Sequence, residues 1–422
     1  MEMREKIVII GGGFAGLQLA KKLNNKNKKI IVIDKVNHHM FQPLFYQVAC
    51  GRIEPSNISF PFRKIFQNSK NIRYRMTEVV KIIPEENKIL TNTDDAEFTY
   101  DKLIIATGCK TNFFGNQTME QLTFGMKNTQ EAIAIRNHVL MTFEKLIIER
   151  KRSDDGNWNI VIVGSGPTGV ELAGAFAEMK KDILPRDYPN MNFDDLNVIL
   201  VSSTEKPLSI MSAESQKMSE KYLKDLGVKF MSDEFVTGYD GDRVMMKSGK
   251  SIPSNNVIWA AGVTGNIIEG LHPETLVKNR YRTDRFNRVL GYTNIFAIGD
   301  IAYMETPKYP LAHPQVANVA INQGKNLAKN LLKKSEEDWT EYEYEDQGSM
   351  ATIGKHRAVV DLPKFKFQGF FAWYFWMFLH LMLILSVRNK IAIFFNWMWS
   401  YFNKDSSLRL IIVPNKQNGT QQ

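Results

Sequence analysis

The stretch Ile7-Val8-Ile9-Ile10-Gly11-Gly12-Gly13-Phe14-Ala15-Gly16-Leu17-Gln18-Leu19-Ala20 decides the fold class of this chain. Its first four residues predict a buried strand, and the residues from Leu17 onward predict a helix. Between them, Gly11, Gly13 and Gly16 form the pattern G-x-G-x-x-G. This pattern permits a tight turn and lets backbone amides approach a pyrophosphate at the start of a helix. The stretch therefore predicts a dinucleotide-binding strand, turn and helix.

The next predicted strand supports this interpretation. Ile30-Ile31-Val32-Ile33 is apolar and ends at Asp34, where a carboxylate would accept hydrogen bonds from ribose hydroxyls. The alternative is a glycine-rich turn with a purely structural role. Strand, helix and acid in this order favour nucleotide binding.

A second copy of the pattern begins with Ile160-Val161-Ile162-Val163 and continues with Gly164, Gly166 and Gly169. Two pyrophosphate sites in one chain suit a hydride exchange between a permanently held electron carrier and a diffusing one. The alternative is a duplicated fold in which one site is inactive. The strand that follows, Val198-Ile199-Leu200-Val201, ends in Ser202 rather than an acid. NADH is the expected nicotinamide, and this serine leaves its preference over NADPH open.

The arrangement of these patterns predicts an α/β protein with two doubly wound, Rossmann-like domains. The run from Asn294 to Asp300 is a buried-strand pattern ending in Gly-Asp, which is expected to return the chain to the first domain. We expect a discontinuous FAD-binding domain at 1–112 and 283–335, an NAD(H)-binding domain at 113–282, and a C-terminal membrane-anchoring helical region at 336–422.

Composition excludes several classes of protein. Cys50 and Cys109 are the only cysteines and are far apart in sequence, so a disulfide framework and a cysteine-based metal site are both disfavoured. The histidines lack metal-ligand spacing, and no metal is expected. The net charge of +9 does not by itself select a partner, and no nucleic-acid role is assigned. No apolar signal-peptide core precedes the first strand, so the catalytic domains are expected in the cytoplasm.

The C-terminal region is rich in aromatic residues. No charged residue lies between Lys366 and Arg388, a run just long enough for one transmembrane helix. Trp and Tyr are spread throughout this run rather than gathered at its edges. Flanking basic residues suit helices that lie in the membrane interface, and monotopic attachment is the preferred interpretation. A dimer contact through the same helices is compatible with it.

Taken together, the chain resembles the type II NADH dehydrogenases, the single-subunit NADH:quinone oxidoreductases of the pyridine nucleotide-disulfide oxidoreductase superfamily. The resemblance covers essentially the whole chain. It rests on the two glycine motifs, Phe41 to Ala49, Val170 to Gly174, Phe296 to Asp300, Pro314 to Gly324 and the aromatic C-terminus. The family segment Ala-Gln-x-Ala-x-Gln reads Ala317-Asn318-Val319-Ala320-Ile321-Asn322 here, with a shorter amide at both glutamine positions.

The resemblance and the motifs together give three sets of expected site residues. The FAD set is Gly11, Gly12, Gly13, Phe14, Ala15, Gly16, Asp34, Lys35, Pro43, Leu44, Val79, Ala106, Thr107, Gly108, Asp300 and Ala317. The NADH set is Gly164, Ser165, Gly166, Gly169, Glu171, Ser202, Ala261 and Gly262. The quinone set is Gln47, Ala317, Asn318, Gln323 and His380.

Glu171 is the expected catalytic residue. It lies two residues past Gly169, on what we take to be the first turn of a helix, and matches the family glutamate near the nicotinamide and the flavin ring. A proton-transfer or substrate-orienting role is the hypothesis. The alternative is an acid that only complements the helix dipole.

The implied activity is respiratory transfer of a hydride from NADH to FAD and then of two electrons to menaquinone or ubiquinone, without proton pumping. The expected location is the cytoplasmic face of the inner cell membrane, with a homodimer possible. Two alternatives remain at this point: a flavin-containing NAD(P)H-dependent redox sensor, and a related quinone reductase such as sulfide:quinone oxidoreductase.

Overall fold

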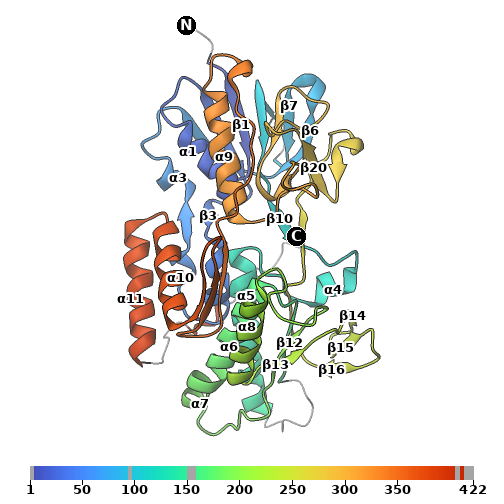
Figure 1. The fold of residues 1–422 in the computed structure, drawn as a ribbon, viewed down its shortest axis with the longest axis vertical. Coiled ribbons are helices and arrows are strands. Elements are labelled where there is room, and N and C mark those ends of the chain that lie inside the picture. The colour runs from blue at the N-terminus through green and yellow to red at the C-terminus, as the bar shows by residue number, and fades with distance from the viewer. Residues whose placement is uncertain (1–3, 94–96, 150–157, 404–408, 413–422) are drawn as a thin grey trace. The chain divides into compact units, whose positions relative to one another are not determined.

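The strand expected at the start of the chain forms as β1 (Lys6–Ile10), the middle strand of a five-stranded parallel sheet in the computed structural model (Figure 1). The sheet has the order β21-β9-β1-β2-β5. Side chains of β1 alternate between its two faces: Ile7 and Ile9 belong to one apolar core, and Val8 and Ile10 to another. This alternation is the period of two expected for a strand buried on both sides.

The structure describes residues 4–93, 97–149, 158–403 and 409–412, which group into two compact units. The first unit contains 1–40, 59–110 and 263–347, and the second contains 41–58, 111–262 and 348–422. The domain ranges expected from the sequence divide the chain by the cofactor that each part binds, whereas these units divide it by compactness. The expected ranges therefore stay a prediction.

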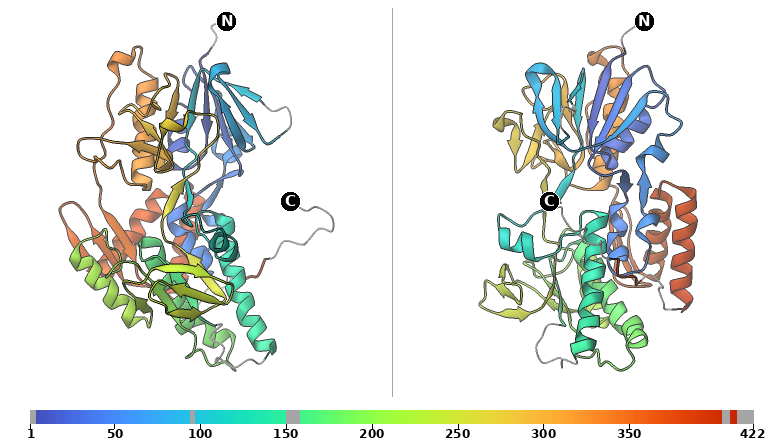
Figure 2. Two further views of the ribbon diagram at one scale, coloured as in Figure 1. Left: turned by 90° about the vertical axis from the view of Figure 1, so that its right-hand side faces the viewer. Right: turned by 180° about the vertical axis from the view of Figure 1, so that it is seen from behind.

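In the first unit, helices α1 (Phe14–Lys22) and α9 (Ala317–Leu331) pack against each other over one face of the sheet, as the views of Figures 1 and 2 agree. Strand β21 (Ile295–Ala297) pairs with β9 (Lys102–Ile105). The prediction that the run ending at Asp300 returns the chain to this unit is therefore confirmed. The other elements are β2 (Lys29–Asp34), β3 (His38–Met40), β4 (Ser59–Pro61), α3 (Phe62–Ile65), β5 (Ile72–Met76), β6 (Val79–Ile83), β7 (Lys88–Thr91), β8 (Glu97–Thr99), β18 (Val263–Gly265), β19 (Leu276–Val277), β20 (Arg280–Thr283) and β22 (Ala302–Met304), with β10 (Cys109–Thr111) crossing a boundary between the units.

The second unit repeats the arrangement around β11 (Ile160–Val163), in a four-stranded parallel sheet with the order β13-β12-β11-β17. Helix α6 (Pro167–Glu178) follows β11 directly. The other elements before the C-terminal region are α2 (Phe45–Ala49), α4 (Gln117–Leu122), α5 (Thr129–Glu149), α7 (Leu184–Asp187), β12 (Val198–Val201), α8 (Ala213–Asp225), β13 (Lys229–Met231), β14 (Val236–Tyr239), β15 (Arg243–Met246), β16 (Ser251–Pro253) and β17 (Asn256–Trp259).

The C-terminal region adds an antiparallel sheet of β23 (Ser349–Thr352), β24 (Ala358–Asp361) and β25 (Lys366–Gly369), followed by two helices. The sheet contacts α6 and α8, and α10 (Phe370–Leu383) packs on it. Helix α11 (Val387–Asn403) lies beside α10, as Figure 2 shows. The carboxylate of Asp361 holds this sheet to α8 by accepting three hydrogen bonds, from the backbone N–H of Ser212 at 2.6 Å, the hydroxyl of Ser212 at 2.9 Å and the hydroxyl of Ser215 at 2.7 Å.

The uncharged run between Lys366 and Arg388 does not form one long helix, as the single-span alternative required. Its first residues belong to β25, and α10 has 14 residues, about 21 Å at 1.5 Å per residue. Within the described ranges, no helix combines the length and the apolar character that crossing a bilayer requires.

Candidate dinucleotide sites

The first glycine turn is packed too tightly for side chains at Gly11, Gly12 and Gly16, and at Gly12 the obstacle is the buried ring of Phe62 at 2.2 Å. A Cβ on Gly11, whose φ is +102°, would lie 2.3 Å from the carbonyl oxygen of Ala106, and one on Gly16 would lie 2.0 Å from the carbonyl oxygen of Gly11. At Gly13, by contrast, no atom lies within 4 Å of the Cβ position. Gly13 is the N-cap of α1, and as a glycine it provides no side chain to accept a hydrogen bond from the first-turn amides. This geometry fits a pyrophosphate.

Asp34 is tied to the same turn. Its carboxylate accepts hydrogen bonds from the backbone N–H of Gly12 at 2.7 Å and of Val36 at 3.0 Å. Burial raises the pKa of Asp34, and the two backbone hydrogen bonds work against that rise. The acid therefore shapes the turn itself, beside any contact it makes to a ribose.

His39, on β3, contacts this turn, and no motif in the sequence indicated that contact. Its Nδ1 lies 2.9 Å from the carbonyl oxygen of Gly12, and the ring is buried. Burial lowers its pKa to about 4, so the ring is neutral at neutral pH. Burial excludes plain surface exposure for His39.

The carboxyl end of β9 brings other predicted FAD residues together. Thr107 donates its hydroxyl to the carbonyl oxygen of Asn266 at 2.7 Å, and the Asn266 amide donates back to the Thr107 carbonyl at 2.9 Å. The Sγ of Cys109 donates to the carboxylate of Asp300 at 3.0 Å. Asn266 has no motif around it in the sequence, and only the fold reveals its role.

The remaining predicted FAD residues are scattered over both units. Ala106 and Val79 are buried, Lys35 is exposed, and Ala317 begins α9 half-buried. Pro43 and Leu44 belong to the second unit, where Leu44 is buried.

The second glycine turn has the same construction as the first. A Cβ on Gly164, at φ +106°, would lie 2.8 Å from the backbone of Ala260, and one on Gly169 would lie 1.9 Å from the carbonyl oxygen of Gly164. Gly166 again faces open space at the start of α6. Ala261 and Gly262 follow β17 beside this turn, and Gly262 has φ +89°. Both glycine turns therefore have the backbone geometry that a pyrophosphate site requires.

Ser202 replaces the acid in the second unit and makes a comparable contact. Its hydroxyl lies 2.6 Å from that of Ser165 in the glycine turn and accepts from the backbone N–H of Thr204 at 3.1 Å. Both serines are buried. Hydroxyls here connect the second strand to the turn as Asp34 does in the first unit, without a charge.

Glu171 does not lie on the first turn of its helix, as expected from the sequence, but on the second turn of α6, because the helix begins at Pro167. Its side chain is only 9% exposed. The backbone N–H of Thr352, on β23, donates to its carboxylate at 3.4 Å. Burial raises the pKa of Glu171 to about 8, and the Thr352 hydrogen bond opposes that rise. The simple helix-dipole interpretation does not describe such a buried acid.

Thr352 also joins Glu171 to α2. The hydroxyls of Thr352 and Tyr46 lie 2.9 Å apart, and the amide of Gln47 donates to the Tyr46 oxygen at 2.9 Å. The indole N–H of Trp397, on α11, donates to the carbonyl oxygen of the Gln47 side chain at 2.7 Å. A chain of hydrogen bonds thus runs from the environment of Glu171 to the C-terminal helices.

Of the predicted quinone residues, Gln47 and His380 both lie against the C-terminal helices of the second unit. The ring of His380 stacks on Trp376 with centroids 4.1 Å apart, and burial lowers its pKa to about 4. Ala317, Asn318 and Gln323 belong to α9 in the first unit, where the Gln323 side chain accepts a hydrogen bond from the N–H of Gly299 at 2.7 Å. Among the described residues, no group of three His, Cys, Asp or Glu side chains could hold a metal ion.

Comparison with known proteins agrees with this geometry. Residues 5–324 match the pyridine nucleotide-disulphide oxidoreductase family, and residues 347–404 match the NDH2 C-terminal domain. Two type II NADH:quinone oxidoreductases of Mycobacterium tuberculosis, Ndh and NdhA, are 30% and 31% identical to this chain. Each alignment covers 95% of this chain, and the relatives are covered to 89% and 88%.

The solved structure of NDH2 from Plasmodium falciparum in complex with NADH superimposes with a TM-score of 0.90 at 20% identity, covering 97% of this chain and 100% of the other. That likeness concerns the fold. The family follows from the sequence matches, which extend over both glycine turns and the C-terminal region. This chain therefore belongs to the type II NADH:quinone oxidoreductases, within the pyridine nucleotide-disulphide oxidoreductase family.

Proposed function

We propose that this protein is a respiratory NADH:quinone oxidoreductase that carries FAD and oxidises NADH without pumping protons. The observation that carries the proposal is the pair of glycine turns, each closed by glycines that admit no Cβ and each open in front of a helix N-terminus. One turn suits a resident dinucleotide and the other a diffusing one. Residues 1–112 with 283–335 form the proposed FAD domain, and 113–282 the NAD(H) domain.

In the FAD site, the backbone from Gly11 to Gly16 would receive the pyrophosphate, and Asp34 the adenosine ribose. Asp300 and Thr107, held by Cys109 and Asn266, supply polar groups at the carboxyl end of β9 and beyond β21. Bound FAD supplies a ring that accepts a hydride from reduced nicotinamide and later releases two electrons.

In the NADH site, the turn from Gly164 to Gly169 would receive the nicotinamide dinucleotide, with Ser165 and Ser202 at the adenosine end. Glu171 is the proposed catalytic residue. Because its pKa is about 8, its carboxyl holds a proton at neutral pH and can donate a hydrogen bond. Turnover that is unchanged in Glu171→Gln would remove this role.

Quinone is the proposed electron acceptor, either menaquinone or ubiquinone, with Gln47, Ala317, Asn318, Gln323 and His380 as its proposed contacts. His380 is neutral at neutral pH because burial lowers its pKa to about 4. A neutral ring suits a neutral quinone better than an imidazolium would.

Attachment to the cytoplasmic face of the inner membrane through α10 and α11 is part of the proposal. Large apolar side chains are exposed on both helices, including Phe371 at 80% and Phe395 at 64%. Exposed Lys364, Lys366 and Arg388 lie at the ends of this region, where they would meet anionic lipid. The same apolar surface could instead form the contact of a homodimer.

The sulfide:quinone alternative is not favoured. Cys50 is buried and donates its thiol to the carbonyl oxygen of Gln47 at 3.6 Å, and burial raises its pKa. Such a thiol is a poor nucleophile. The two relatives that are 30% and 31% identical to this chain are named as NADH:quinone oxidoreductases.

The test uses the purified full-length protein. We expect a yellow protein with bound FAD whose flavin absorbance bleaches on mixing with NADH and returns on addition of a short-chain quinone. In proteoliposomes, NADH oxidation is expected to change the pH only by the protons that quinone reduction itself consumes, with no proton translocation across the bilayer. Protein that binds no flavin after refolding with excess FAD, or flavin that does not bleach with NADH, contradicts the proposal.

A further inference from the structure

The second glycine turn differs from the first at the position where a dinucleotide site commonly recognises the adenosine ribose. The strand registers of the two parallel sheets are equivalent, and they place Ser202 of the second unit where Asp34 lies in the first. An acid at this position selects NADH, because it accepts hydrogen bonds from the free 2′-hydroxyl and repels the 2′-phosphate of NADPH. Ser202 carries no charge and provides no such repulsion.

A pair of hydroxyls takes the place of the carboxylate. In the first turn, Asp34 accepts a hydrogen bond from the N–H of Gly12. In the second turn, the residue equivalent to Gly12 is Ser165, whose hydroxyl lies 2.6 Å from that of Ser202. The hydroxyl of Ser202 also lies 2.9 Å from that of Thr204. Ser165 and Ser202 are only 7% and 3% exposed, so the uncharged pair is built into the turn.

The loop after β12 folds back to the glycine turn and carries a cation with it. The backbone N–H of Leu208 donates to the carbonyl oxygen of Ser165 at 2.8 Å. Within the loop, the hydroxyl of Thr204 donates to the carbonyl oxygen of Lys206 at 2.9 Å. Lys206 is half-buried, and its ammonium makes no ion pair or hydrogen bond with a described residue. A cation on a loop fixed in this way attracts a phosphate bound at the turn.

The buried acid nearest to Ser202 is already neutralised. The backbone N–H of Glu234 donates to the carbonyl oxygen of Ser202 at 2.9 Å. The carboxylate of Glu234 pairs with the ammonium of Lys250 at 2.7 Å and accepts from the hydroxyl of Ser248 at 2.7 Å. It therefore does not replace the missing acid at the ribose.

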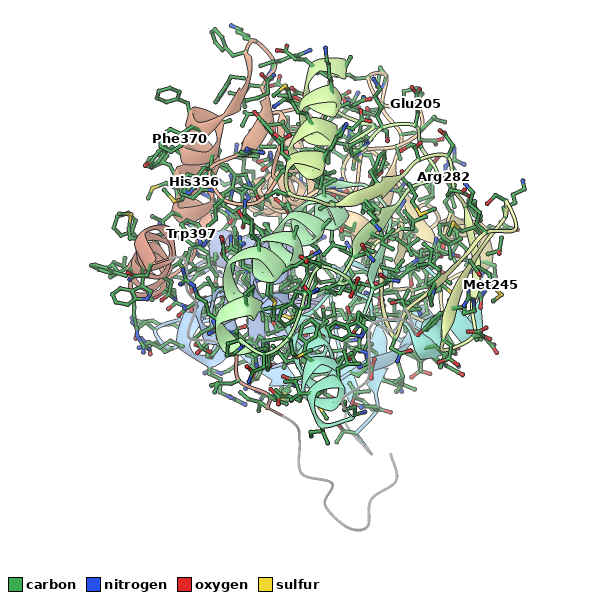
Figure 3. The ribbon with its side chains drawn as sticks, turned by 90° about the horizontal axis from the view of Figure 1, so that it is seen from below. Glu205, Met245, Arg282, His356, Phe370 and Trp397 are labelled. Atoms are coloured by element: carbon green, nitrogen blue, oxygen red, sulfur yellow. The ribbon has the colours of Figure 1, made fainter. Side chains whose placement is uncertain are left out.

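Two exposed acids, Glu205 and Asp233, are the other carboxylates close to this loop in sequence or by backbone contact. Figure 3 labels Glu205 on the side of the second unit away from Phe370 and Trp397. Exposed carboxylates act on a ligand through water and are screened by salt. The experiment below tests both of them directly.

We propose that the nicotinamide site of this protein takes NADPH as well as NADH, with no more than about tenfold preference between them. The inference rests on the proposed function, since it assigns the second glycine turn to the nicotinamide dinucleotide. Ser165 and Ser202 meet the ribose without a charge, and Lys206 attracts the 2′-phosphate. The reaction stays balanced: NADPH gives up a hydride, one proton comes from solution, the quinone becomes a quinol and NADP⁺ leaves.

The experiment compares ADP-ribose with ADP-ribose that carries a 2′-phosphate, because these are the adenosine-side parts of NADH and NADPH. Each is titrated by calorimetry into the full-length, flavin-loaded protein. Neither ligand has a nicotinamide ring, so binding is measured without hydride transfer. We expect Kd values within about tenfold of each other. Anaerobic bleaching of the flavin by NADH and by NADPH should give a similar ratio of half-saturating concentrations.

One variant rebuilds the first turn in the second unit. Ser165→Gly combined with Ser202→Asp supplies the glycine and the carboxylate that Gly12 and Asp34 provide in the first unit. The double variant should weaken the 2′-phosphate ligand at least tenfold relative to ADP-ribose, because the new carboxylate repels the phosphate. Retained flavin shows that the variant is folded.

A second variant removes the cation and does not depend on the folding of the first. Lys206→Met keeps the length of the side chain and should weaken the 2′-phosphate ligand about tenfold relative to ADP-ribose, since a charge-assisted contact is lost. Lys224→Met, at an exposed position in the last turn of α8, is the matched control. It should leave the ratio of the two affinities within about twofold.

Three results would overturn the proposal. The first is wild-type binding of ADP-ribose more than about tenfold tighter than binding of its 2′-phosphate. The second is an unchanged ratio in both the double variant and Lys206→Met. The third is a tenfold gain for the 2′-phosphate ligand in Glu205→Gln or Asp233→Asn, which would make that acid the selecting carboxylate. Binding of neither ligand would contradict the proposed function as well, whereas binding of ADP-ribose alone would contradict only this inference.

Discussion

Replacing Glu171 by glutamine should change how the stability of the protein depends on pH. The carboxyl is buried beside Thr352 and has its pKa raised to about 8 from the ordinary value of 4.5. The folded protein therefore keeps the proton over a pH range in which the unfolded chain has lost it. Because the unfolded chain releases the proton more easily, each rise in pH between 4.5 and 8 favours the unfolded chain, and the wild type loses stability. Glutamine has nearly the same shape and does not ionise in this pH range.

The two pKa values fix the size of the effect. Linkage at about 1.4 kcal/mol per pH unit gives a total loss on the order of 5 kcal/mol above pH 8. About half of that loss falls between about pH 6 and about pH 9. For a unit of this size, about 1 kcal/mol corresponds to roughly 2 °C in Tm. We therefore expect the Tm of Glu171→Gln, relative to wild type, to rise by about 5 °C between these two pH values.

The assay is thermal unfolding of the flavin-loaded proteins without NADH, followed by flavin fluorescence at both pH values. Glu214→Gln, at an exposed position in α8, is the control and should track wild type at both. A difference between Glu171→Gln and wild type that stays constant with pH would refute the reasoning, because it would mean that the native carboxyl is already ionised and solvated.

Four other substitutions have defined outcomes. Gly16→Ala places a Cβ 2.0 Å from a backbone oxygen and should abolish bound flavin, measured by absorbance. Gly169→Ala, with a corresponding distance of 1.9 Å, should retain flavin and lose its bleaching by NADH. Arg52→Met leaves the buried Glu178 without its guanidinium partner. It should lower the free energy of unfolding in urea by about 3–5 kcal/mol. A loss smaller than about 1 kcal/mol would mean that water replaces the guanidinium. Asp361→Ala removes three hydrogen bonds to the start of α8, and limited proteolysis should then cut the C-terminal sheet while the flavin stays bound.

The glycine turns were predictable because their constraint is local. At Gly16 and Gly169 the clash that excludes a side chain is with Gly11 and Gly164 of the same motif. Gly11 and Gly164 are closed instead by Ala106 and Ala260 from distant strands, which the motif alone does not reveal. The return of β21 to the first sheet was also predictable, since a short continuous apolar run that ends in Gly-Asp is typical of a strand buried on both faces.

The surroundings of Glu171 were not predictable, because they come from distant parts of the chain. Thr352 donates to it from 181 residues away, and Thr352 meets Tyr46 across 306 residues. A periodic pattern carries no information about such contacts, so the sequence indicated only a position on the first turn of a helix for Glu171. The uncharged C-terminal run left a single membrane span open as an alternative for a related reason. The backbone turns at Gly369, at φ +85°, between β25 and α10, and hydropathy alone does not register that change of direction.

The interleaving of the two units along the chain has a consequence for biosynthesis. The first sheet needs β21 at residues 295–297, which are translated only after the whole of the second sheet, and the second unit in turn needs 348–403 from the very end. The first unit is therefore complete only once residues 263–347 have been translated, and the second only once 348–403 have followed. Until then each nascent sheet has an unpaired edge or an uncovered helix. Cutting the gene between the units yields no self-sufficient half, so the enzyme must be produced, and inherited, as one piece.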